Sequence, residues 1–215
     1  RQRQMCIRDS HKPEMVLALE PFEALCGFRT PRKAASILEG LEAPLAKRML
    51  ALLVAQPSAH GMRAAFRMLV APAMRPDPAE ITVLANECAA RLESHRSPSP
   101  RIDRAVALLN EKYPGDPGVA ATLLLNPVSL KPGEAMFVPA GALHSYLSGF
   151  AVEIMASSDN VLRAGITPKK VDADELLQCV SVTAAPPIRI APERLSDATS
   201  AYFAPVSYTH LRAHE

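Results

Sequence analysis

The chain has 215 residues, of which 48% are hydrophobic and 21% are charged, and this composition excludes an intrinsically disordered protein. Its 24 basic and 22 acidic residues nearly cancel, so that the formal net charge is only +2. The sequence has neither a basic field nor an apolar run of roughly 18–20 residues. We therefore expect no nucleic-acid partner and no membrane partner.

The two ends of the chain differ in character from the rest. RQRQMCIRDS opens the sequence and VSYTHLRAHE closes it. Both look like translated vector or adapter sequence, which is left out of fold reasoning. We treat residues 1–10 and 206–215 as tails of non-native appearance. The four cysteines form no CxxC pair, which favours reduced core cysteines in a cytoplasmic protein.

Residues 11–30 predict one or two short strands, because Val16, Leu17, Phe22 and Leu25 form an apolar segment that Pro21 divides.

The pattern becomes helical over residues 31–112, where we expect three or four helices in an all-α module. The clearest start is Asp77-Pro-Ala-Glu80: Asp77 can cap the helix, Pro78 suits its first position and Glu80 can bond back to the cap.

Residues 113–205 predict a β region that follows the turn-rich segment YPGDPG. The short apolar segments VAATLLLNPVSL, EAMFVPA and FAVEIMAS are expected to be strands, and Lys131-Pro-Gly133 is expected to be a turn. A short helix is predicted at 172–180, where Asp172 can cap and Glu175 follows three residues later.

Two constellations could carry chemistry. In His11-Lys12-Pro13-Glu14, Glu14 could bind a divalent metal, and Lys12 would face the same side of an extended chain. A solvated charged turn would also explain this short motif.

The second constellation is the run HSYLSGFAVEIMASSDNVLRAGITPK, which extends from His144 to Lys169. The preceding segment fits the spacing G-x5-P-x-G-x2-H from Gly133 to His144, which predicts a strand, a tight turn and a return that points the imidazole into the mouth of a β-barrel. A satisfied core histidine is the alternative.

The run resembles the signature of class I mannose-6-phosphate isomerases, H-A-Y-x-x-G followed by E-x-M-A-x-S-D-N and R-A-G-x-T-P-K, from which it departs mainly at Ser145. HKPE resembles the other hallmark of this family. The resemblance covers roughly residues 11–205. It implies a mixed α and β fold: a partial cupin-type β-barrel (jelly roll) from 11–30 and 113–205, with an all-α helical insertion domain at 31–112.

The resemblance also implies roles for single residues. Glu14 and His144 would be two ligands of one catalytic zinc ion. Lys12, Asp159 and Arg163 would be catalytic residues. Tyr146 and Lys169 would bind the substrate. Structural alternatives are a barrel-rim aromatic for Tyr146, a turn residue for Asp159 and a solvated end for Lys169.

Three other polar residues are given structural interpretations. Glu153 shares a strand face with Ala151 and Met155, and an acid there favours a buried ion pair. His60 and His95 are expected to be solvated.

The function that the resemblance implies is the interconversion of mannose 6-phosphate and fructose 6-phosphate through a cis-enediol. We expect a small sugar phosphate as the partner, a monomer and a cytoplasmic location. Pathways such as GDP-mannose biosynthesis or mannose use stay open.

Complete members of the family carry a barrel segment before HKPE whose Gln-x-His pair completes the zinc site, and this chain lacks it. We therefore expect this fragment to bind zinc weakly and to have little activity. Two other classes are a non-catalytic cupin-like protein that binds sugar phosphates or regulates, and a helical interaction module. The module predicts that Glu14 and His144 lie far apart.

Overall fold

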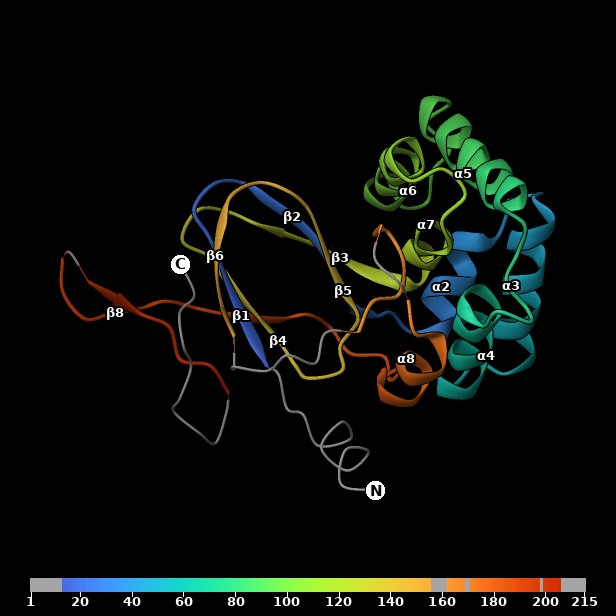
Figure 1. The fold of residues 1–215 in the computed structure, drawn as a ribbon. Coiled ribbons are helices and arrows are strands. Elements are labelled where there is room, and N and C mark those ends of the chain that lie inside the picture. Colours follow the sequence, from blue (N-terminus) through green and yellow to red (C-terminus); the bar gives the residue numbers. More distant parts are fainter. Residues whose placement is uncertain (1–12, 156–161, 169–170, 198, 206–215) are drawn as a thin grey trace, which may run out of the picture. The chain divides into compact units, whose positions relative to one another are not determined.

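Strands and helices fall into two units along the chain (Figure 1). The computed structural model describes residues 13–155, 162–168, 171–197 and 199–205. One unit comprises residues 1–26, 126–161 and 186–215 and contains most of the strands, and the other comprises 27–125 and 162–185 and contains the helices. The mixed α and β character predicted from the sequence is therefore confirmed.

The strand unit is built on two sheets. A four-stranded sheet has the order β6-β1-β4-β7, a three-stranded sheet has the order β3-β2-β5, and β8 pairs with β9. The strands are β1 (Glu14–Ala18), β2 (Phe22–Phe28), β3 (Leu125–Leu130), β4 (Ala135–Val138), β5 (His144–Ser148), β6 (Ala151–Met155), β7 (Ile188–Ile190), β8 (Glu193–Arg194) and β9 (Ser200–Ala201). The break predicted at Pro21 is confirmed, since it separates β1 from β2.

One apolar core joins the inner faces of the two sheets. Alternate residues of β1 and β4 contribute to it from the first sheet, and alternate residues of β2 and β3 contribute from the second. The buried members are Val16, Ala18, Phe22, Ala24, Cys26, Val128, Leu130, Met136 and Val138. Side chains alternate along a strand, so a polar residue two positions away from a core residue points to the same inner face.

The helical unit contains more helices than the sequence predicted. They are α2 (Pro31–Leu38), α3 (Pro44–Ala55), α4 (Ala59–Val70), α5 (Pro78–Glu93), α6 (Pro100–Lys112), α7 (Pro117–Ala121), the 3-10 turn η1 (Thr122–Leu124) and α8 (Ala173–Cys179). Five of them, α2 to α6, lie within residues 31–112, where three or four were expected. Pro57 and Ser58 divide α3 from α4, because Ser58 accepts a hydrogen bond from the His60 N–H and begins a new helix.

One predicted strand is wrong. The first part of VAATLLLNPVSL forms α7 and η1, and only its second half forms β3. Asp116 accepts a hydrogen bond from the Gly118 N–H, and Pro117 occupies the first helical position. This local capping starts a helix in a short apolar run that periodicity alone cannot assign.

The predicted helix starts are confirmed where capping residues are explicit. Asp77 and Glu80 form the complete capping box of α5, and Asp172 accepts from the Glu175 N–H at the start of α8. Among the described residues, Cys26, Cys88 and Cys179 are unbridged thiols, and His60 and His95 are exposed, as expected. No described helix has the length and apolar character needed to cross a membrane.

A buried ion pair connects three helices of this unit. The Arg91 guanidinium of α5 donates to both carboxylate oxygens of Asp103 on α6, with Nε···Oδ2 and Nη2···Oδ1 distances of 2.6 Å. Its Nη1 donates to the carbonyl of Ile37 on α2, at 2.7 Å. Arg91 is 7% exposed and Asp103 is 0% exposed, so each charge depends on the other.

Substitution of Arg91 should therefore destabilise the helical unit strongly. Arg91→Leu leaves the Asp103 carboxylate buried without its cationic partner, and the free energy of unfolding should fall by about 3–5 kcal/mol. Urea unfolding followed by circular dichroism at 222 nm measures the loss. Lys47→Ala is the control, because it removes an exposed pair with Glu42 and should leave the midpoint unchanged. Equal midpoints for Arg91→Leu and the control would contradict this expectation.

Candidate metal centre

Four polar side chains meet at one end of the inner faces of the strand unit. On β1, Glu14 lies on the same face as the core residue Val16, and the register places Glu153 of β6 opposite Val16. Glu14 and Glu153 are therefore diagonal neighbours on the inner face of the first sheet.

The second sheet contributes the other two groups by the same rule. The core residues Ala24 and Cys26 of β2 lie opposite Tyr146 and His144 of β5, respectively. Because paired residues share a face, both β5 side chains point toward the inside. Each of the four side chains therefore points into the site because of the alternating side-chain direction along its own strand.

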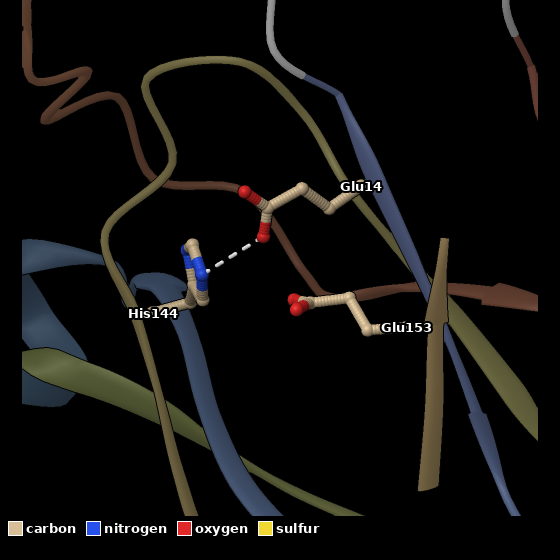
Figure 2. Close-up of side chains that lie close together, drawn as sticks. All are labelled: Glu14, His144 and Glu153. Atoms are coloured by element: carbon tan, nitrogen blue, oxygen red, sulfur yellow. Dashed lines mark ion pairs between the residues drawn. The ribbon is translucent and has the colours of Figure 1, made fainter. Parts of the chain in front are cut away.

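Three of these side chains, Glu14, His144 and Glu153, converge closely (Figure 2). Oε2 of Glu14 lies 3.1 Å from Nε2 of His144. Glu14, His144 and Glu153 each offer a ligand atom, and these atoms all lie within 4.8 Å of one another. Glu14 is 7% exposed, whereas His144 and Glu153 are half-buried. The helical interaction module predicted a large separation of Glu14 and His144, and this geometry contradicts it.

Both ring nitrogens of His144 have acceptors. Nδ1 lies 3.0 Å from the Ala142 carbonyl, and Nε2 faces Glu14. Burial by itself would lower the pKa of His144, but the hydrogen bonds to Glu14 and Ala142 outweigh burial and raise the pKa. The Ala142 contact fixes the proton on Nδ1, so that Nε2 is the nitrogen available to a cation in place of its proton.

Tyr146 and Glu153 form a second linked pair. The Tyr146 hydroxyl donates to Oε1 of Glu153 at 2.5 Å. Burial raises the pKa of Glu153, and the charge of Glu14 adds to this effect against the opposing hydrogen bond from Tyr146. Burial and the neighbouring Glu153 also raise the pKa of Tyr146, which therefore stays a hydrogen-bond donor.

From the sequence we expected Glu153 to form a buried ion pair. Among the described residues, its carboxyl group instead lies beside a tyrosine hydroxyl, a second carboxyl group and an imidazole. Its hydrogen-bond partners among them are the uncharged hydroxyl of Tyr146 and the carboxyl group of Glu14, and it also faces His144. The available signal was the strand alternation, which placed Glu153 on an inner face. The pairing of β6 with β1 was the missing fact, because it brings that face to Glu14.

Of the other site residues singled out from the sequence, one belongs to the helical unit and three are not described by the structure. Lys12, Asp159 and Lys169 fall outside the described residues. Arg163 lies half-buried in the segment 162–168, which belongs to the helical unit.

A hollow of about 350 Å³ in the helical unit is of a different kind. It is bounded by Arg75, Pro76, Pro78, Tyr113, Pro114, Gly115, Asp116 and Pro117. Prolines dominate this lining, and Asp116 is its only carboxylate. Among the residues that the structure describes, the donor set that could hold a metal is Glu14, His144 and Glu153 of the strand unit.

This donor set suits a divalent cation. Imidazole nitrogen and carboxylate oxygen are typical ligands of zinc and related metals, and a further carboxylate beside such an ion can take part in proton transfer.

The comparison with family models gives no match. The comparison with curated proteins finds relatives that are named mannose-6-phosphate isomerase. Mannose-6-phosphate isomerase of Rattus norvegicus is 36% identical over 188 residues, which are 82% of this chain and 44% of the relative. Mannose-6-phosphate isomerase of Escherichia coli K12 is 38% identical over 177 residues, which are 82% of this chain and 43% of the relative. The chain thus spans less than half the length of these relatives.

Solved structures agree with the sequence comparison. A mutant phosphomannose isomerase from Salmonella typhimurium matches with a TM-score of 0.75 and 37% identity, over 91% of this chain and 48% of that one. A zinc-bound mannose 6-phosphate isomerase matches with a TM-score of 0.74 and 37% identity, over the same shares. This agreement in sequence and in fold places the chain in the mannose-6-phosphate isomerase family, whose members it matches over somewhat less than half of their length.

Proposed function

We propose that this chain contributes the metal centre of an aldose–ketose isomerase that interconverts mannose 6-phosphate and fructose 6-phosphate. The observation that carries the proposal is the convergence of Glu14, His144 and Glu153 from the inner faces of two sheets. The names of the curated relatives support the substrate.

Zinc is the metal that we propose for this site. Oε2 of Glu14 and Nε2 of His144 lie 3.1 Å apart, so one ion could contact both atoms. Carboxylate oxygen and imidazole nitrogen are ligands that zinc accepts. A solved relative is described as zinc-bound, which supports the same metal. When bound, zinc would supply Lewis-acid polarisation of the carbonyl and hydroxyl oxygens of the sugar.

Glu153 is assigned to the sugar rather than to the metal. One of its oxygens accepts the Tyr146 hydrogen bond, which holds the carboxylate in place beside the proposed ligands. A carboxylate held in this position can take a proton from a sugar hydroxyl and return it. We propose that Glu153 holds or moves a proton at a sugar hydroxyl, with Tyr146 orienting it at the rim.

The remaining roles follow the sequence interpretation and are proposals. The transfer of a proton between C1 and C2 needs a base and a cationic group that stabilises the enediolate or grips the phosphate. Arg163 offers a planar fork for either purpose. Lys12 and Asp159 are the other catalytic groups that we propose, and Lys169 is the other substrate-binding group.

The finer features of the fold and cellular setting are proposals of the same kind. We propose that residues 11–30 and 113–205 belong to a cupin-type barrel and that 31–112 form its helical insertion. The enzyme would be a cytoplasmic monomer that supplies routes such as GDP-mannose synthesis.

The test of the function is an assay of mannose 6-phosphate isomerisation in a chimaera. In the chimaera, this chain replaces the matched region of the Escherichia coli relative. We expect turnover that a chelator abolishes and zinc restores. The 215-residue chain alone should turn over little, because Glu14 and His144 supply two of the three or four protein ligands usual for zinc. Sugar-phosphate binding without turnover in the chimaera would instead indicate a non-catalytic binding protein.

Loss of the Glu14 carboxylate should affect zinc binding, whereas loss of the Glu153 carboxylate should affect the rate of catalysis. In the chimaera, Glu14→Gln should weaken zinc binding by roughly 10- to 100-fold. Glu153→Gln should lower kcat by about 10²- to 10⁴-fold and leave zinc affinity unchanged, because it removes a proton-transferring group. Calorimetric zinc titration and initial rates measure the two effects. An equal loss of zinc affinity in both variants would make Glu153 a metal ligand.

The planar guanidinium of Arg163 should also be required. Arg163→Lys keeps the charge but loses the two-pronged donor, and kcat should fall by about 10²- to 10³-fold in the chimaera. Steady-state kinetics with mannose 6-phosphate measure the change. Arg67→Lys, on α4, is the matched control and should retain the original kcat. Retention of kcat in Arg163→Lys would remove this residue from the catalytic set.

A further inference from the structure

The turn that follows Arg163 has an unusual backbone. Gly165 has a φ of +142°, and Ile166 has a φ of +54°. The left-handed region is unfavourable for a β-branched residue such as isoleucine, and a residue persists there only where its surroundings hold it. Something must therefore fix the segment 162–168 in this conformation.

The carboxylate of Asp116 makes the contact that holds this turn. Its Oδ1 accepts a hydrogen bond from the Ile166 N–H at 3.0 Å, and the same atom accepts from the Gly118 N–H at 2.7 Å. One carboxylate oxygen therefore joins the start of α7 to the segment that carries Arg163. The two ends of the Asp116–Ile166 bond are 50 residues apart in sequence.

Two glycines allow this close approach. A Cβ atom on Gly118 would lie 2.5 Å from Cγ1 of Ile166, and a Cβ atom on Gly165 would collide with Oδ1 of Asp116. The Ile166 side chain thus packs directly on the α7 backbone. The contact is therefore built from both sides and is more than a single polar bond.

A helix cap alone does not require this arrangement. Asp77 caps α5 in the same unit, where its side chain accepts from Ala79, two residues ahead. Asp116 makes the equivalent bond to Gly118 and adds the distant bond to Ile166. The second bond is what distinguishes Asp116 from an ordinary cap.

We propose that Asp116 is a positioning residue for Arg163: its Oδ1 atom fixes the strained turn at Gly165 and Ile166 and thereby sets the backbone from which the guanidinium extends. This inference rests on the proposed role of Arg163, whose guanidinium would contact the sugar phosphate at the enediolate or at the phosphate group. Asp116 itself touches no reacting atom in this scheme.

The anchor is tested by hydrogen exchange of the Ile166 amide in the full 215-residue chain. Asp116→Ala removes both bonds, and exchange at Ile166 should accelerate by roughly 10- to 100-fold. Asp116→Ser can still cap α7 but cannot reach Ile166, so it should accelerate exchange equally. Asp116→Asn should restore slow exchange, because both bonds use one oxygen that an amide also provides. Asp77→Ala is the control and should leave Ile166 unchanged.

The positioning role is tested by mannose 6-phosphate binding to the same chain, followed by calorimetry. Asp116→Ala should weaken binding by about tenfold, and Asp116→Asn should restore it. In an Arg163→Ala background, Asp116→Ala should cause no further loss, because its effect passes through Arg163.

Three results would overturn the inference or its basis. Unchanged Ile166 exchange in Asp116→Ala would exclude the anchor. An additive loss of binding in the double variant would exclude action through Arg163 and leave Asp116 a structural residue. If neither the wild-type chain nor the chimaera binds or converts mannose 6-phosphate, the proposed function is wrong. The hydrogen-exchange experiment would still decide whether Asp116 holds the turn.

Discussion

The candidate metal centre depends on the alternation of side chains along strands that share one core. The inner faces that bury Val16 and Ala24 are the faces from which Glu14 and Tyr146 project. The carboxylate of Glu14 is 7% exposed, and an acid in such a place is costly unless it is paired. His144 provides that pairing from the opposite sheet. The packing of the core and the chemistry of the site are therefore consequences of one arrangement.

The helical unit handles buried charge by the same principle. Arg91 and Asp103 pair with each other, and Arg91 also donates to the carbonyl of Ile37, which ties three helices together. Asp116 satisfies two backbone amides with a single oxygen. In both cases the charged group also contacts a backbone group far away in sequence: Arg91 contacts Ile37, and Asp116 contacts Ile166.

Local patterns in the sequence predicted elements well where the signal was chemical. Pro21 divided two strands, and Asp77 with Glu80 began α5, because prolines and capping residues act on their immediate neighbours. Hydrophobic pattern alone was less reliable. The apolar run after Pro117 was predicted as a strand and forms α7 and η1, since short buried helices and short buried strands have the same composition.

The sequence by itself determined the family, through motifs whose residue types and order are specific, and it identified Glu14 and His144 as a pair. Only the tertiary structure showed that their side chains lie 3.1 Å apart and that Glu153 joins them. The pairing of β6 with β1 decided the position of Glu153, and the bond from Asp116 to Ile166 joined two segments 50 residues apart. Strand register and long-range contacts arise from the packing of the whole chain, so no local pattern could contain them.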